Sequence, residues 1–280
     1  MEKERYEVFN TPSYVYLMYD SIDKLTLRKS GAVYALEQLG LMSNNYNIYS
    51  PVSGKIIGTK KVKSLNNEVN TLVVENDYKD KCSKIKTGKE IYDYYKRKEA
   101  NELFSTFNIE GKFNGKKYIM VDLTIKSNNL ENKYIVSKYN YEILETIDAI
   151  QKIFSIDTAY IAVNNGIIQS LLEEYSGIYP NIKIVSKVIS NEYTVLYNGY
   201  DIIKIYNALK FNRYYNIKYV TVVTKKGTIV VKTKVNILVS ELMMFLNLEN
   251  SNTSVITYSN EKINNYDGIL SKDIKVIIAL

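Results

Sequence analysis

The chain has 280 residues with 37 Lys and Arg, 30 Asp and Glu, a single cysteine and neither histidine nor tryptophan, so its formal net charge is +7. Without histidine there is no imidazole base for a Ser-His-Asp or Cys-His site and no His-ligated metal. One cysteine, Cys82, cannot make an intramolecular disulfide, a thiolate zinc site or an iron–sulfur cluster. The composition therefore disfavours hydrolases and metalloenzymes, and we expect no metal.

The charged start and the absence of a run of about 20 apolar residues argue against a signal peptide and a membrane span. We therefore expect a cytoplasmic protein. The 27 tyrosines accompany many Asn, Lys and Ile residues, which is typical of codon usage in an AT-rich genome. The alternative is that tyrosines form stacking platforms for nucleic acid, which would require lysines interleaved with them on one surface.

Residues 1–88 show short apolar segments between turn signals, which is typical of a small β domain. Tyr14–Met18 alternates in side-chain direction, Ser50–Gly58 turns into a strand, and Thr71–Val74 forms another. The spacing of Thr87 and Glu90 fits a capping box. It predicts a helix over Glu90–Phe107.

Residues 89–215 alternate between strand and helix patterns. Strands are predicted at Lys117–Ile125, Thr158–Val163 and Ile182–Val188, and helices at Tyr139–Phe154, Ile167–Tyr175 and Asp201–Phe211. Such an order favours a parallel sheet, because parallel neighbours need a crossover connection.

Residues 216–280 return to strands. Val220–Val223 and Thr228–Val231 flank a turn at Gly227, Leu238–Leu246 is a predicted helix, and Val255–Tyr258 and Ile274–Ala279 are predicted strands. Two strands, a helix and two more strands resemble a β-grasp module.

Taken together, these segments resemble the RnfC-like family, the C subunits of Rnf-type electron-transport complexes and relatives such as proline-reductase-associated electron-transfer proteins. The matching stretches, in the family's order, are Leu27–Val33, Tyr49–Ile56, Val73–Asp77, Tyr118–Lys138, Tyr160–Asn165, Tyr197–Ala208 and Tyr219–Val223. The resemblance implies a chain that mixes β and α/β domains. These are a barrel-sandwich (lipoyl-like) domain over 1–88, a Rossmann-like domain over 89–215 and a soluble-ligand-binding β-grasp domain over 216–280.

The chain departs from the family at the redox sites. Family members carry a glycine-rich loop whose bare amides approach flavin phosphates, whereas Ala100–Glu110 contains no glycine. At the family's Glu-Cys-Glu-Pro run this chain has Thr124–Ser127, with Ile125 at the cysteine's position, and Val121 replaces the family's asparagine. The family's cysteine region follows the β-grasp domain, but the sequence ends at Leu280. We therefore expect no flavin, no iron–sulfur cluster and no other cofactor.

Two groups of residues are candidate binding sites. Asn164, Asn165 and Gly166 follow a predicted buried strand, where α/β sheets bind ligands. The same residues also suit a left-handed turn with a helix N-cap. Lys60, Lys61, Lys63, Lys225 and Lys226 are possible docking lysines, although exposed strand edges are commonly lysine-rich to prevent aggregation.

Three other features favour structural roles. Gly111–Lys117 lacks the ending of a phosphate-binding P-loop and reads as a basic hairpin turn. Cys82 lies near Lys79, Lys81 and Lys84, which would favour the thiolate, but no base or resolving cysteine pairs with it. Glu173 and Glu174 fall on the polar side of a helix.

The function expected from these features is that of a non-catalytic accessory or scaffold protein of an anaerobic electron-transfer or amino-acid reductase system. It would work through a protein partner, which could also hold it at a membrane. One alternative is an electron-transfer subunit that uses cofactors of a partner. Another is a basic module that binds nucleic acid or a different polyanion weakly, with a salt dependence set by counterion release.

Overall fold

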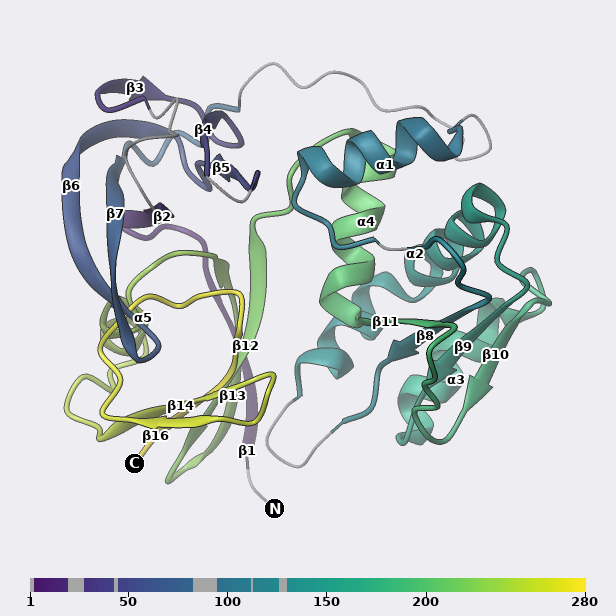
Figure 1. The fold of residues 1–280 in the computed structure, drawn as a ribbon. Helices are drawn as coiled ribbons and strands as arrows, with labels where there is room; N and C mark the ends of the chain where they lie inside the picture. The colour runs from purple at the N-terminus through teal and green to yellow at the C-terminus, as the bar shows by residue number, and fades with distance from the viewer. Residues whose placement is uncertain (1–2, 20–27, 43–44, 83–94, 112, 126–129) are drawn as a thin grey trace. The chain divides into compact units, whose positions relative to one another are not determined.

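The computed structural model of the chain describes residues 3–19, 28–42, 45–82, 95–111, 113–125 and 130–280 (Figure 1). These residues form two compact units. The β unit combines residues 1–84 with 216–280, and the α/β unit comprises residues 85–215.

The β unit contains three sheets and the short helix α5 (Val239–Phe245). Its strands are β1 (Lys3–Phe9), β2 (Tyr14–Tyr19), β3 (Gly31–Val33), β4 (Gln38–Leu41), β5 (Asn47–Tyr49), β6 (Gly54–Ser64), β7 (Asn67–Asn76), β12 (Ile217–Thr224), β13 (Gly227–Lys234), β14 (Thr253–Thr257), β15 (Lys262–Asn264) and β16 (Ile274–Ala279). The sheet orders are β1-β13-β12-β16-β14-β15, β2-β7-β6-β3 and β4-β5. The two strands, the helix and the two later strands predicted after residue 216 are present as β12, β13, α5, β14 and β16, and β15 is an additional strand.

The two ends of the chain fold together in this unit. Strand β1 pairs in parallel with β13, so the N-terminal segment completes the C-terminal sheet. One cluster of buried side chains contains Leu17 and Leu72 from the N-terminal segment and Val220, Leu242 and Ile277 from the C-terminal one. These two segments therefore share one core. The division into domains over 1–88 and 216–280 remains a prediction.

The Ser50–Lys55 stretch, which carries much of the family resemblance, lies at the centre of this packing. Ser50, Val52 and Ser53 are almost fully buried, and the Ser50 hydroxyl donates to the Val52 carbonyl oxygen. Gly54 pairs with Asn76 where β6 meets β7. A Cβ atom at Gly54 would lie 1.8 Å from the Glu75 carbonyl oxygen, so only glycine lets the strands approach this closely.

The α/β unit has a four-stranded parallel sheet, as the alternating pattern predicted. Its elements in chain order are α1 (Arg97–Thr106), β8 (Tyr118–Asp122), α2 (Glu131–Phe154), β9 (Thr158–Ala162), α3 (Gly166–Ser176), β10 (Ile182–Val185), β11 (Thr194–Asn198) and α4 (Gly199–Phe211). The strand order is β10-β9-β8-β11, so the direction of winding reverses between β8 and β11. The pattern of predicted elements did not include β11.

Helix α1 begins later than predicted. The predicted capping box at Thr87 and Glu90 lies outside the described residues, and Tyr95 and Lys96 are not helical. The Lys96 amide donates to the Glu99 carboxylate at 3.3 Å. The first turn is therefore fixed by Glu99, and the helix starts at Arg97.

Helix α2 begins earlier than predicted, at Glu131, and is kinked at Tyr139, whose φ of −133° and ψ of 28° are not helical. At the kink, the Asn140 side chain accepts from the Tyr141 amide and donates to the Leu171 carbonyl oxygen. The periodicity from Tyr139 onward thus described only the second part of the helix. In the first part Ile135 and Val136 are buried.

Candidate functional site

The reversal of strand order between β8 and β11 is the place where open α/β sheets bind ligands, outside the carboxyl ends of the strands. Here the first residue of α4 lies close to α2 and to the end of β8. A Cβ atom at Gly199, the first residue of α4, would lie 2.9 Å from Asn132 Oδ1 and 3.0 Å from Leu123 Cδ2. Asn132 Nδ2 in turn donates to the carbonyl oxygens of Thr124 (3.0 Å) and Asp122 (3.4 Å). The starts of α2 and α4 therefore pack closely against each other at this position.

The neighbouring position, after β8 and β9, is bridged by Asn164. Its Oδ1 accepts from the Ile125 amide at 2.7 Å, and its Nδ2 donates to the Ile125 carbonyl oxygen at 2.8 Å. Ile125 stands where the resemblance places the family's flavin-segment cysteine. Asn164 thus ties this segment to β9 through both backbone groups. Lys126 and Ser127 of the same segment lie outside the described residues.

Asn165 is the N-cap of α3. Its Oδ1 accepts from the amides of Ile167 (3.1 Å) and Ile168 (3.3 Å). The N-cap interpretation of the Asn164, Asn165 and Gly166 turn is therefore confirmed. The left-handed turn is wrong, because Asn165 has a φ of −132° and none of the three residues has a positive φ.

We expect Asn165→Ala to lower the free energy of unfolding by about 1 kcal/mol, because the α3 amides lose their acceptor. Asn165→Asp, which keeps an acceptor oxygen, should stay close to the wild type in chemical denaturation followed by circular dichroism. Equal losses in both variants would contradict the capping role.

The segment 100–110, where the resemblance places the glycine-rich flavin loop, forms most of α1 and a short turn instead. Ala100, Phe104, Phe107 and Ile109 are buried. The rings of Phe104, Phe113 and Phe154 form one aromatic cluster, in which Phe113 stacks on Phe154 with centroids 3.9 Å apart. Hydrophobic packing therefore fixes this segment as helix and core.

In the turn after α1, backbone carbonyl oxygens accept hydrogen bonds from neighbouring side chains. Lys204 Nζ donates to the Asn108 carbonyl oxygen (3.2 Å) and the Tyr197 hydroxyl donates to that of Glu110 (2.9 Å). Burial raises the pKa of Tyr197 far above its usual value, with a further contribution from Asp201, so the hydroxyl keeps its proton. A phosphate needs converging donors, whereas this turn presents acceptors. A flavin phosphate therefore does not fit this turn.

The remaining sequence candidates belong to other elements. Asn114 and Gly115, with a Gly115 φ of 73°, form a turn that leads into the parallel strand β8, so Gly111–Lys117 is not the predicted hairpin. Lys112 lies outside the described residues. Lys225 and Lys226 occupy the exposed turn between β12 and β13.

The lysines of β6 point in two directions. Side chains alternate along a strand, so Lys61 and Lys63 lie on one side of β6 and Lys60 on the other. Lys63 also pairs with Asp267 at 3.4 Å. The five candidate docking lysines therefore do not all share one face, and their role in docking stays a prediction.

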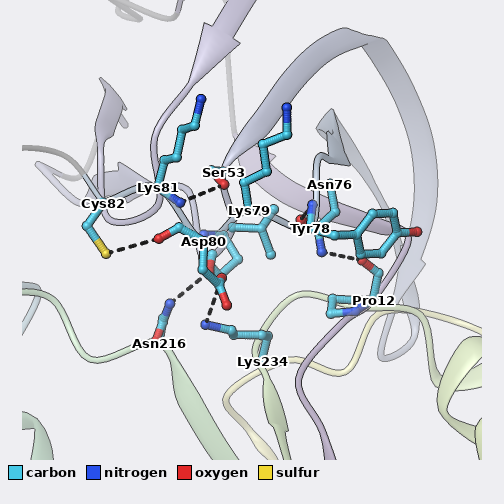
Figure 2. A network of polar contacts seen from close by, with 12 residues as sticks. Pro12, Ser53, Asn76, Tyr78, Lys79, Asp80, Lys81, Cys82, Asn216 and Lys234 are labelled. Atoms are coloured by element: carbon cyan, nitrogen blue, oxygen red, sulfur yellow. Dashed lines mark hydrogen bonds and ion pairs between the residues drawn. The ribbon is translucent and has the colours of Figure 1, made fainter.

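A polar loop follows β7 in the β unit (Figure 2). The Ser53 hydroxyl donates to Asp77 Oδ1 (2.6 Å) and accepts from the Lys81 amide (3.0 Å). Asp77 also accepts from the Lys79 amide at 3.0 Å. Tyr78 and Asp80 have positive φ values of 57° and 45°, which the bonds around them hold in place.

Asp77 makes this loop sensitive to acid. The hydrogen bond from Ser53, followed by that from the Lys79 amide, lowers the pKa of Asp77 below its usual value. A carboxyl whose pKa is lowered on folding stabilises the fold above its unfolded pKa, and this stability is lost as pH falls through its folded pKa. We expect wild type to exceed Asp77→Asn in stability at neutral pH, with the difference shrinking below about pH 4. A difference that is constant from pH 7 to 3 would contradict this.

Cys82 ends the described part of this loop. Its Sγ donates to the Asp80 carbonyl oxygen at 3.6 Å, and its side chain is exposed. Lys84 lies outside the described residues. Within the described ranges no group of three or more Cys, Asp or Glu side chains could hold a metal ion, and no helix is long and apolar enough to cross a membrane.

Comparison with protein-family models and with curated proteins gives no match. Among solved structures, a chain of NAD+-reducing NiFe hydrogenase in the H2-reduced state is similar at 5% identity and a TM-score of 0.49, over 68% of this chain and 47% of that one. A chain of NAD+-reducing NiFe hydrogenase in the air-oxidized state is similar at 6% identity and a TM-score of 0.44. That match covers 59% of this chain and 40% of the hydrogenase chain. The chain thus spans less than half the length of the structures that it matches. Scores of this size carry no conclusion about chemistry.

Proposed function

We propose that this chain is a non-catalytic relative of the RnfC-like proteins. It would serve as an accessory or scaffold component of an anaerobic electron-transfer or amino-acid reductase system. The domain names that go with this proposal are barrel-sandwich for residues 1–88, Rossmann-like for 89–215 and β-grasp for 216–280. The protein would act in the cytoplasm, through a protein partner.

The packing of segment 100–110 carries the proposal. In the family this segment would offer glycine amides to a flavin phosphate. In this chain it offers buried aromatic rings and the carbonyl oxygens of Asn108 and Glu110. At the strand-order reversal, Gly199 and Asn132 pack closely against each other. A chain that keeps the order of elements but fills the cofactor positions is suited to binding a partner.

Affinity purification of the tagged chain from its native host, with mass spectrometry and flavin and iron analysis of the eluate, tests the proposal. We expect a redox protein in fixed ratio to the chain, with all cofactor accounted for by that protein. If the chain alone carried one flavin per molecule, the non-catalytic role would be wrong. Recovery of nucleic acid that is lost at high salt, with no redox protein, would instead favour the polyanion-binding alternative.

A further inference from the structure

A polar hollow lies on the outer side of α1. It has a volume of about 610 Å³, and its lining residues are Arg97, Lys98, Asn101, Glu102, Ser105 and Asn114. The volume falls within the range of about 300–1,000 Å³ that is typical of small-molecule sites. We call this feature the α1 hollow. The described residues that line it all have polar or charged side chains, so they would recognise a ligand by charge and hydrogen bonds.

Arg97 is an exposed side chain with two contacts inside the α/β unit. Its Nη2 donates to Asn114 Oδ1 at 3.3 Å, and its Cζ lies 5.8 Å from the centroid of the Phe154 ring. Phe154 is itself fixed by stacking on Phe113. The guanidinium has five donors, and one hydrogen bond to a described residue leaves most of its N–H groups for a ligand.

The α1 hollow has further donors beside Arg97. Within the described parts of the chain, the side chains of Lys98, Asn101 and Ser105 make no hydrogen bond or ion pair, and neither Arg97 nor Lys98 pairs with a carboxylate. Glu102 adds one acceptor among these donors. Two cations with uncharged donors beside them match a phosphate monoester, and a carboxylate at their side matches hydroxyl groups.

We propose that the α1 hollow binds a small phosphate monoester that carries hydroxyl groups, as a sugar phosphate does. Arg97 and Lys98 hold the phosphate, Asn101 and Ser105 donate to its remaining oxygens, and Glu102 accepts from a ligand hydroxyl. The proposal is independent of the role in electron transfer.

Isothermal titration of the full chain with ribose 5-phosphate, inorganic phosphate, ribose and FMN, at constant ionic strength, tests the site. We expect ribose 5-phosphate to bind one per chain with a Kd of about 0.1–5 mM, inorganic phosphate to bind more weakly, and ribose to show no saturable binding. FMN should bind no tighter than ribose 5-phosphate.

Three variants separate this site from general charge effects. Arg97→Gln should weaken ribose 5-phosphate binding about 10- to 100-fold, since charged hydrogen bonds are lost. Arg97→Lys, which keeps the charge and the helix, should also weaken it, because the forked geometry is gone. Lys183→Gln, which removes an exposed charge from β10, is the control and should leave the Kd unchanged.

The proposal is overturned if ribose 5-phosphate gives no saturable binding up to about 20 mM, or if Arg97→Gln and Lys183→Gln weaken it equally. Tenfold tighter binding of FMN than of ribose 5-phosphate would also overturn it, because the ring would then be recognised. Glu102→Gln gives a second reading. This variant should bind inorganic phosphate more tightly, because a negative charge near the phosphate is removed. The difference in Kd between ribose 5-phosphate and inorganic phosphate should become smaller. If the difference in Kd between the two ligands stayed the same, Glu102 would not contact the sugar.

Discussion

Gly54→Ala is expected to lower the free energy of unfolding of the β unit by about 4 kcal/mol, at the upper end of single substitutions. The added Cβ would lie 1.8 Å from the Glu75 carbonyl oxygen and 2.9 Å from the Glu75 carbonyl carbon. Both are backbone atoms of β7, so no side chain can turn away to relieve the overlap. Strands β6 and β7 would have to separate at the centre of the shared core. Urea unfolding with hydrogen exchange measured for each unit would locate the loss.

Gly177→Ala is the matched control. Gly177 has a φ of −61° at the end of α3, and a Cβ there would meet nothing within 4 Å. The same substitution should therefore be neutral or stabilise the chain by about 0.5 kcal/mol, because alanine restricts the unfolded chain. A Gly54→Ala variant with the stability of Gly177→Ala would mean that β6 and β7 do not approach each other as described.

Phe113→Ala is expected to destabilise the α/β unit by about 3–5 kcal/mol, the usual cost of removing a buried phenylalanine ring. Phe113 is 3% exposed and contacts the rings of Phe104, Phe154 and Tyr197. The truncation leaves a cavity among aromatic rings that cannot close without moving α1. Thermal and urea unfolding, followed by circular dichroism, measure the loss.

Phe113→Leu refills most of the volume and should cost less than about 2 kcal/mol. If both variants unfolded like the wild type, segment 100–110 would not be part of a packed core. The space for a flavin loop would then be open again. The pair of variants thus tests stability and the argument about function together.

The sequence predicted the helices and strands in which apolar residues recur at a regular spacing. Buried runs such as Thr158–Ala162 and amphipathic helices such as α3 have side-chain spacings that few other structures satisfy. The hairpin of β12 and β13 followed from its turn at Gly227. The spacing of apolar residues was less informative at α1 and α2. The carboxylate of Glu99 fixes the start of α1, and the side-chain amide of Asn140 bonds at the kink of α2.

The pairing of strands that are far apart in the chain could not be predicted from the sequence. Nothing in Lys3–Phe9 indicates that it pairs in parallel with β13, more than 200 residues away. The missing glycines of segment 100–110 were visible in the sequence, but the aromatic cluster behind them was not, because Phe104, Phe113 and Phe154 come from separate elements. The α1 hollow likewise depends on Asn114 meeting Arg97 across a turn.

Titration of the purified chain with FMN, followed by flavin fluorescence and by NADH oxidation with an artificial acceptor, tests the central claim most directly. We expect no saturable FMN binding below about 100 µM and no NADH oxidation above background, because aromatic side chains and carbonyl oxygens occupy the flavin-loop segment. One FMN bound per chain at micromolar concentration, with NADH oxidation that depends on it, would contradict the proposal that this chain is non-catalytic.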